Sequence, residues 1–476
     1  MKKTKIVCTL GPASSDESIL EAMLKSGMNV ARLNFSHGTH EQHKRMIEKF
    51  RRVRDKLGMP AAVMLDTKGP EIRLRDFKDG KAFIKHGDSY VLTVNERLGD
   101  SEGASVSYPK LAEQMKRGVK LLINDGRVRL TVERVEGAEI FCRVDVGGEL
   151  SDHKGINVIG VAVDMPYLSE ADQSDLIFGV ENDVDFVAAS FMRRKEDAIA
   201  MRRFLDYNGG HKIKIIAKIE NLEGIEKFDE ILKLVDGIMV ARGDMGVEVE
   251  FERLPGLQKK FIRSCYQAGK MVITATQMLE SMITNMMPTR AEITDVANAV
   301  FDGTSAVMLS GESAMGMYPL ESVKAMTRIV EQAEQDALEQ GLYKTVHYDL
   351  DTRDITNAIC DAACTTARDT NARAIIALTK HGQTARSMSK FRPSKPIVAA
   401  TPEMKTFHQL SLSWGVYPVL AQVQQSWDAL SLHAIDCARM IDMVEDGDTV
   451  VIAAGLPLGI AGNTNLLEVR TVGQYL

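Results

Sequence analysis

The segment KIIAKIE (214–220) is an apolar run that ends with two charged side chains, Lys218 and Glu220. A charge inside a protein is costly unless it is paired or used in function. The next apolar run along the chain, GIMVARGD (237–244), also ends in a basic and an acidic residue. Side chains two residues apart on a strand face the same side, so we expect Lys218 and Glu220 to share one site.

Short apolar runs with polar C-terminal ends recur along the chain, and helical patterns such as DESILEAMLKSG (16–27) lie between most of them. The eight runs span residues 5–11, 30–36, 61–67, 185–190, 214–220, 237–243, 271–276 and 306–313. Eight strand–helix repeats predict a parallel (β/α)₈ TIM barrel, which places catalytic residues at the C-terminal ends of its strands. We predict that this barrel comprises residues 1–70 and 165–340.

The gap between the third and fourth runs predicts an inserted domain. Residues 71–164 contain the all-β patterns SYVLTV, ASVSYP, RVRLTVERV and AEIFCRV, separated by turn residues. The insertion follows the third strand on the catalytic face, so we predict that it is a small β lid domain. A second strand–helix alternation predicts a C-terminal α/β regulatory domain with an open sheet over residues 341–476.

Composition excludes several classes of protein. A chain of 476 residues is too long for one ordinary core, and its net charge of −6 argues against nucleic acid as the main partner. No run of 18 apolar residues occurs, and the N-terminus enters a strand pattern without a cleavable signal, so we expect a cytoplasmic protein that makes no membrane contact. The six cysteines are scattered and have no spacing typical of a zinc site, which favours reduced core thiols.

The predicted strand ends gather polar residues in one layer of the barrel. They are Arg32, Asn34, Ser36, Asp66, Thr67, Ser190, Lys218, Glu220, Arg242, Asp244 and Thr276. A structural ion pair explains Lys218 and Glu220 if that pair is taken alone, but it does not explain a whole layer of polar ends. No Cys–His pair or Ser–His–Asp set occurs among these positions, so acyl-enzyme chemistry is poorly supported.

The residue types at these ends suit particular ligands. Glu220 and Asp244 are hard carboxylates suited to one Mg²⁺ or Mn²⁺ with positions open for substrate oxygens. Lys218 and Arg32 are cations suited to phosphoryl oxygens. The segment RGDMG (242–246) is predicted to be a glycine-containing turn whose N–H groups bind a carboxylate. An all-oxygen set suited to a monovalent cation comes from Asn34, Ser36, Asp66 and the Thr67 carbonyl.

These residues lie in segments that resemble the pyruvate kinase family over essentially the whole chain. IKIIAKIENLEGI (213–225) is similar to that family's long active-site signature. Further matching segments are ARLNFSHG (31–38), LDTKGPEIR (65–73), MVARGDMG (239–246), TATQMLESM (274–282), PTRAE (288–292) and VMLSGESA (307–314). The resemblance implies transfer of the phosphoryl group of phosphoenolpyruvate to ADP, giving pyruvate and ATP in the last step of glycolysis, by a homotetrameric, allosteric enzyme.

The resemblance also implies a role for each matching residue. Lys218 would stabilise the phosphoryl group in transfer and the enolate oxygen, Arg32 would bind the phosphoryl group, and Thr276 would help to orient the water that delivers a proton. Gly243 and Asp244 would complete the substrate site. The divalent ion would be held by Glu220 and Asp244, the K⁺ by Asn34, Ser36, Asp66 and Thr67, and the nucleotide by Asn34, His37, Arg73 and Lys154. A glutamate at position 71 goes with K⁺ dependence in this family.

The chain departs from the family pattern at positions around the predicted lid. Asn124 stands where an aspartate is usual, His153 where a lysine often stands, and Gln42 where an aromatic residue often lies near the adenine. Met286 and Met287 replace a common Pro-Arg pair. None of these changes falls on the predicted catalytic residues.

The loop TKHGQT (379–384) joins a predicted strand to a helix in the C-terminal domain. Its hydroxyls, its glycine backbone and the helix N-terminus suit a phosphate, although a plain capped turn explains the same residues. The predicted effector residues are Thr379, Lys380, His381, Gly382, Gln383 and Thr384. The glycine-rich loop GLPLGIAGNTN (455–465) is placed to close over a sugar phosphate. In the family, matching loops bind an activator, usually fructose 1,6-bisphosphate, and other phosphorylated sugars or nucleotides remain alternatives.

Two other functions are compatible with such a barrel. A different phosphoenolpyruvate-using enzyme, a lyase or mutase, also needs a divalent ion and carboxylates, but it needs no basic residues facing a nucleotide, whereas Arg73 and Lys154 are present here. A metabolite sensor without turnover is disfavoured by the complete catalytic set.

Overall fold

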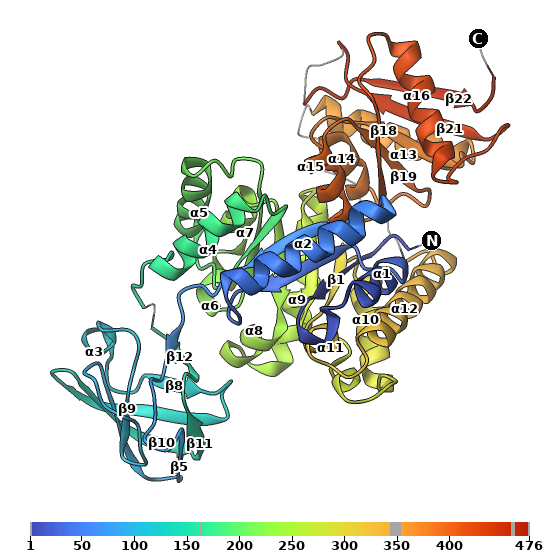
Figure 1. The fold of residues 1–476 in the computed structure, drawn as a ribbon. Helices are drawn as coiled ribbons and strands as arrows, with labels where there is room; N and C mark the ends of the chain where they lie inside the picture. Colours follow the sequence, from blue (N-terminus) through green and yellow to red (C-terminus); the bar gives the residue numbers. More distant parts are fainter. Residues whose placement is uncertain (1, 162, 343–353, 458–461, 475–476) are drawn as a thin grey trace.

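The computed structural model describes residues 2–161, 163–342, 354–457 and 462–474. Its central unit is a closed barrel of eight parallel strands, which confirms the predicted (β/α)₈ fold (Figure 1). The strands, in order around the barrel, are β1 (Lys5–Thr9), β2 (Val30–Asn34), β3 (Ala62–Asp66), β13 (Phe186–Ala189), β14 (Lys214–Ile219), β15 (Gly237–Ala241), β16 (Met271–Ala275) and β17 (Ala306–Leu309).

Helices follow the barrel strands along the chain, and most of them cover the outside of the barrel, whereas α8 lies at the barrel mouth. They are α1 (Glu17–Lys25), α2 (His40–Leu57), α4 (Glu170–Glu181), α5 (Lys195–Tyr207), α6 (Leu222–Glu226), α7 (Phe228–Leu234), α8 (Arg242–Glu248), α9 (Leu254–Gln267), α10 (Arg290–Phe301), α11 (Gly311–Ala314) and α12 (Pro319–Glu339). Thr39, Ser169 and Thr289 begin α2, α4 and α10 with capping boxes, which satisfy otherwise unpaired N–H groups. Every barrel strand ends before its predicted limit, so the polar residues fall at or just beyond the strand ends, where loops leave the barrel.

The insertion after β3 is all-β with one short helix, as predicted. A seven-stranded sheet runs in the order β4 (Ile72–Arg73), β12 (Gly155–Ile159), β8 (Lys120–Ile123), β9 (Val128–Glu136), β10 (Glu139–Val146), β6 (Ser89–Thr93) and β7 (Gly103–Ser105). Strands β5 (Lys81–Ile84) and β11 (Gly148–Ser151) pair separately, and α3 (Leu111–Gln114) is the helix. The inserted domain has a hydrophobic core of its own, which includes Tyr90, Leu121 and Ile140. The unit projects away from the barrel in Figure 1.

The C-terminal unit is an open α/β sheet, also as predicted. Its strands run in the order β20 (Val416–Leu420), β19 (Ile397–Thr401), β18 (Ala374–Leu378), β21 (Thr449–Ala454) and β22 (Leu466–Thr471), and only β22 is antiparallel to its neighbour. The helices are α13 (Ile355–Asp369), α14 (Gln383–Lys390), α15 (Met404–Gln409) and α16 (Trp427–Met440). Part of the predicted connection after residue 341 lies outside the described residues.

The C-terminal unit packs against the end of the barrel that is opposite to the predicted site. Lys405 of α15 forms ion pairs with Asp183 and Asp185, which precede β13. His408 of the same helix lies against Arg54 of α2. The lid and the C-terminal unit therefore contact opposite ends of the barrel (Figure 1). Among the described residues, no helix is long and apolar enough to cross a membrane.

Candidate active site

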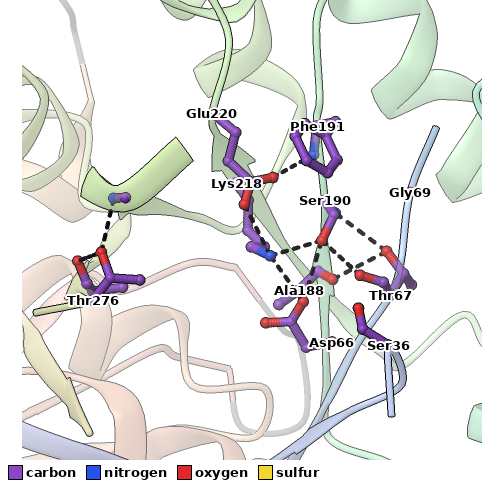
Figure 2. A network of polar contacts seen from close by, with 12 residues as sticks. Ser36, Asp66, Thr67, Gly69, Ala188, Ser190, Phe191, Lys218, Glu220 and Thr276 are labelled. Carbon is purple, nitrogen blue, oxygen red and sulfur yellow. Dashed lines mark hydrogen bonds and ion pairs between the residues drawn. The ribbon is translucent and has the colours of Figure 1, made fainter. Parts of the chain in front are cut away.

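The ammonium of Lys218 is the centre of a buried polar network at the C-terminal end of the barrel (Figure 2). Its Nζ lies 3.0 Å from Asp66 Oδ1, 3.0 Å from Glu220 Oε1 and 2.7 Å from Ser190 Oγ. Burial by itself lowers the pKa of Lys218, but the two carboxylates outweigh that effect and raise the pKa well above its usual range. Lys218 therefore carries a positive charge that is held in one place. The structure brings Lys218 and Glu220 to one site, as their spacing predicts.

Asp66 joins the two cations of the site. Its Oδ2 accepts a hydrogen bond from Arg32 Nε at 2.6 Å, while its Oδ1 faces Lys218. Arg32 Nη1 also donates to Thr9 Oγ1 at 2.8 Å. Burial opposes ionisation of Asp66, but Arg32 and Lys218 overcome it and lower the pKa of this carboxyl. Arg32 and Lys218 are thus presented together, as binding of a phosphoryl group requires.

Glu220, which is buried, and Asp244, which is half-buried, form a pair of carboxylates. Burial, assisted by the charge of Asp244, raises the pKa of Glu220 to about 7 against the opposing effect of Lys218. Burial likewise raises the pKa of Asp244. The backbone N–H of Phe191 donates to Glu220 Oε2 at 2.6 Å and fixes its orientation. A cation between the two groups would relieve their repulsion, so the pair fits a divalent metal ion.

Within the residues that the structure describes, no cluster of three or more acidic, histidine or cysteine side chains is arranged to hold a metal. Two carboxylates with open positions suit a hard ion that also takes water or substrate oxygens.

The segment RGDMG corrects one prediction. It forms the first turn of α8 and not a free glycine turn, because the chain enters a helix directly after β15. Arg242 points to Asp295, with Nη1 2.6 Å from Oδ2, and so serves a structural ion pair. The N–H of Gly243 donates to Thr276 Oγ1 at 2.9 Å. Thr276 has a φ of +66°, a backbone conformation that costs energy in a β-branched residue and that clusters at functional sites.

The four predicted ligands of a monovalent cation lie at the neighbouring ends of β2 and β3. Asn34 is the register partner of Asp66, and the Asn34 Oδ1 accepts a hydrogen bond from Ser36 N at 3.1 Å. The Thr67 carbonyl follows directly and accepts a hydrogen bond from Ser190 Oγ at 2.6 Å. Of this oxygen-rich set, Asp66 contacts Lys218 directly and Thr67 contacts it through Ser190 (Figure 2).

A cleft of about 940 Å³ separates the barrel mouth from the lid. Its lining includes His37, Arg73, Lys154 and Asp244, but Asn34 does not line it. Arg73 is held by Glu71, with Nη2 2.6 Å from Oε2, and by the His153 carbonyl at 2.8 Å. Three of the four predicted nucleotide residues thus face one cleft together with a predicted metal ligand.

Two of the positions that depart from the family pattern lie at the same cleft. Asn124 and His153 line it, and both have positive φ angles. Gln42 instead completes the cap of α2, where its Oε1 accepts a hydrogen bond from Thr39 N at 2.9 Å. A nearby aromatic contact is the stacking of Phe35 on His43, with ring centroids 4.1 Å apart.

A second cavity, also of about 940 Å³, is lined mostly by the C-terminal unit and also by Ala268 and Gly269, which follow α9 of the barrel. Five of the six predicted effector residues line it: Thr379, Lys380, His381, Gln383 and Thr384. Gly382, with a φ of +81°, is the N-cap of α14. Thr384 Oγ1 lies 2.8 Å from Thr464 Oγ1, so both predicted loops meet at this cavity. The middle of the 455–465 loop lies outside the described residues.

Sequence reasoning gave Ser190 no role in the site. It marked Ser190 only as a strand end, yet the hydroxyl contacts Lys218, Asp66 and the Thr67 carbonyl. The signal available in the sequence was its position, because Ser190 ends the apolar run DFVAAS at the level of the other polar strand ends.

The fold and the site define a (β/α)₈-barrel enzyme with a buried, cation-rich site for an anionic substrate. Comparison with known proteins agrees with this class. Residues 1–323 match the family described as pyruvate kinase, barrel domain, and residues 357–470 match pyruvate kinase, alpha/beta domain. The chain belongs to the pyruvate kinase family.

Full-length relatives support the assignment. The chain is 46% identical over 473 residues to pyruvate kinase of Clostridium acetobutylicum, covering 99% of this chain and 100% of the relative. It is 46% identical over 474 residues to the Clostridium perfringens enzyme, with 99% and 100% coverage. The Staphylococcus aureus (strain MRSA252) pyruvate kinase is 46% identical over 483 residues, which cover all of this chain and 81% of that protein.

Proposed function

We propose that this chain transfers the phosphoryl group of phosphoenolpyruvate to ADP, giving pyruvate and ATP in the last step of glycolysis. The observation that carries the proposal is the position of Lys218. Its buried ammonium is held by Asp66, Glu220 and Ser190 beside Arg32. These protein groups, rather than water, stabilise its positive charge. Such a preorganised cation stabilises charge that develops in transfer without reorganisation.

The two cations take different roles in the proposal. Arg32 binds the phosphoryl group, because its guanidinium has five N–H donors, of which Asp66 Oδ2 uses the one on Nε and Thr9 Oγ1 uses one on Nη1. Lys218 stabilises the phosphoryl group in transfer and the enolate oxygen. Thr276 lies by the methylene carbon and helps to orient the water that protonates it. The Gly243 N–H, which contacts Thr276 Oγ1 at 2.9 Å, completes the substrate site with Asp244.

Two metal sites follow from the donor sets. Glu220 and Asp244 would hold Mg²⁺ or Mn²⁺, and Asn34, Ser36, Asp66 and the Thr67 carbonyl would hold K⁺. When bound, a divalent ion supplies Lewis-acid stabilisation of phosphoryl and enolate oxygens. Its presence would also keep Glu220 ionised, which burial otherwise opposes.

The nucleotide would enter the cleft between the barrel and the lid. Arg73 lies in β4 of the lid and Lys154 directly precedes the neighbouring strand β12, where Gly155 is the register partner of Arg73. His37 comes from the barrel side. Basic residues on one wall facing Asp244 on the other suit a metal-bound polyphosphate. Asn34, which does not line the cleft, would act on the nucleotide only through the neighbouring cation site.

Regulation and assembly complete the proposal. The cavity around Thr384 would bind a phosphorylated sugar, and the enzyme would be a cytoplasmic homotetramer with an effector-sensitive arrangement.

Four methionines near the loops after β16 and β17 support a surface that another subunit covers. They are Met286, Met287, Met315 and Met317, and each side chain is more than half exposed in the single chain.

The alternative is another phosphoenolpyruvate-using barrel enzyme, and an assay for products separates the two. Purified chain is mixed with phosphoenolpyruvate, Mg²⁺ and K⁺, with and without ADP, and pyruvate and ATP are measured together. We expect equal amounts of pyruvate and ATP, formed only when ADP is present. Consumption of phosphoenolpyruvate without ADP, or no consumption at all, would overturn the proposed function.

A further inference from the structure

Ser190 lies between Lys218 and the end of β3 in the active-site network. It follows β13 and is 1% exposed, so its hydroxyl is not shared with solvent. Its Oγ lies 2.7 Å from Lys218 Nζ, 2.6 Å from the Thr67 carbonyl and 3.2 Å from Asp66 Oδ1 (Figure 2). One hydroxyl thus touches the proposed catalytic cation and two of the proposed K⁺ ligands.

The donors and acceptors available at each atom determine the direction of these hydrogen bonds. An ammonium can only donate hydrogen bonds, so Ser190 Oγ accepts from Lys218. The hydroxyl has one proton, and the shorter contact gives it to the Thr67 carbonyl rather than to Asp66. A carbonyl oxygen has two lone pairs, which leaves one for a cation. The result is a directed chain from Lys218 through Ser190 to an oxygen of the cation site.

The backbone around Ser190 fixes this chain in one position. Ser190 N donates to Thr67 Oγ1 at 3.2 Å, and the hydroxyl of Tyr167 donates to the Ser190 carbonyl at 3.2 Å. Gly69, with a φ of +75°, packs so closely that a Cβ there would lie 2.9 Å from Ser190 Cβ. The loop after β3 therefore rests directly on Ser190, and the two cannot move independently.

We propose that Ser190 is a positioning residue that couples the monovalent-cation site to Lys218. A cation on the Thr67 carbonyl and Asp66 holds these oxygens in place, the carbonyl orients the Ser190 hydroxyl, and the hydroxyl holds the Lys218 ammonium at the level of the phosphoryl group. This inference rests on the proposed function. It explains how a monovalent cation beside the reacting groups supports phosphoryl transfer in two ways: by its charge, and by fixing the position of Lys218 through Ser190.

The test is the variant Ser190→Ala in the full-length protein, with K⁺ titrated against tetramethylammonium at constant ionic strength. We expect the K⁺ concentration for half-maximal activity to rise about tenfold or more and kcat to fall about tenfold, the scale of losing a hydrogen bond to a charged group. The KM for ADP should stay within about threefold, since Ser190 does not line the lid cleft. Equilibrium binding of Tl⁺, a K⁺-sized probe, should weaken without any substrate present.

Tyr167→Phe is the matched control. It removes a hydrogen bond to the same residue at the same depth, but Tyr167 is joined to Ser190 through the backbone carbonyl and not through the hydroxyl. We expect this variant to keep the K⁺ dependence and Tl⁺ affinity of the wild type. If Tyr167→Phe and Ser190→Ala change both quantities equally, the role of Ser190 is packing and the proposal is wrong.

Further outcomes are equally decisive. Ser190→Ala with the K⁺ dependence and Tl⁺ affinity of the wild type would overturn the coupling while leaving the proposed function intact. A wild type that makes pyruvate and ATP but neither needs K⁺ nor binds Tl⁺ would remove the cation assignment itself, and the coupling with it. Ser190→Cys keeps the shape of the side chain but has a weaker hydrogen-bond donor, so its K⁺ dependence should lie between those of the wild type and Ser190→Ala. If Ser190→Ala does not fold, Ser190→Cys is the variant that tests the coupling.

Discussion

Asp66 Oδ1 lies 3.0 Å from the ammonium of Lys218, and its Oδ2 lies 2.6 Å from Nε of Arg32. One fully buried carboxylate therefore holds both cations that the proposed reaction uses. Neither cation has to be recruited when substrate binds, which avoids a reorganisation cost during transfer. The same carboxylate belongs to the proposed K⁺ site, so the site links ion binding to the position of the cations.

The first prediction is a requirement for a monovalent cation. Glu71 at the lid hinge is acidic and pairs with Arg73, so it supplies no positive charge to the site. We expect activity to fall at least tenfold when K⁺ is replaced by tetramethylammonium, because the oxygen set at Asp66 and Thr67 is left without its ion. The measurement is kcat at equal ionic strength. Full activity without K⁺, NH₄⁺ or another ion of similar size would refute the assignment.

A second prediction concerns the lid. Lys154→Ala removes a positive charge from the cleft wall that faces Asp244. We expect the KM for ADP to rise about tenfold, the scale of losing one charged contact, while the KM for phosphoenolpyruvate changes little. Lys120→Ala, an exposed lysine of the same domain outside the cleft, is the control and should behave as wild type. An unchanged KM for ADP in Lys154→Ala would remove this residue from the nucleotide site.

The third prediction concerns the effector cavity. Thr384 is 6% exposed and lies 2.8 Å from Thr464, so Thr384→Glu places a negative charge where a phosphate is proposed to bind. We expect a phosphorylated sugar to lower the apparent KM for phosphoenolpyruvate in the wild type and to have no effect on this variant, with basal kcat nearly intact. Thr370→Glu, exposed at the end of α13, should respond as wild type. If no phosphorylated metabolite shifts the substrate curve, the loop is structural.

A fourth prediction concerns the pH dependence of stability. Burial, assisted by the positive charge of Arg54, lowers the pKa of His408 from 6.5 to about 4. Between these values the unfolded chain binds more protons than the folded chain, so stability is present above pH 6.5 and is lost as the pH falls towards 4. The slope from one such group is at most about 1.4 kcal/mol per pH unit.

His408→Asn tests that contribution. The variant should lose less of its free energy of unfolding than the wild type on going from about pH 7 to about pH 5, as measured by urea unfolding. His211→Asn, a change at an exposed histidine, should leave the slope of the wild type unchanged. Parallel pH profiles for His408→Asn and the wild type would show that this histidine is not held neutral at the interface.

Local sequence patterns predicted much of the fold because the hydrophobic period marks each barrel strand and the helix that follows it. The inserted domain was harder. Strands β4, β5, β8 and β11 have only two to four residues each, β12 (GINVI) contains a glycine and an asparagine, and none of the five was singled out. The boundaries between the domains stay predictions. Packing of α15 against the barrel, through Lys405 and Asp183, joins residues far apart in sequence, and no local pattern reports it.

The site residues that could be predicted are those at the C-terminal ends of the barrel strands. Lys218, Glu220 and Asp66 meet as their positions at the ends of parallel strands require. Ser190 was not assigned a role, because a serine after a strand is common and only its three contacts distinguish it. The helical start at Arg242 was also missed, since a glycine in the first turn reads as a turn signal.

The central claim is that the buried Lys218 ammonium stabilises the phosphoryl group during transfer from phosphoenolpyruvate to ADP. The most direct test compares wild type and Lys218→Met for pyruvate and ATP formation, together with equilibrium binding of Mn²⁺ and phosphoenolpyruvate. Methionine keeps most of the side-chain length and removes the charge. We predict that kcat falls by at least about 100-fold while both ligands still bind, because the ammonium acts mainly on charge that grows in the transition state. A variant that forms pyruvate and ATP at a rate near that of the wild type would contradict the account.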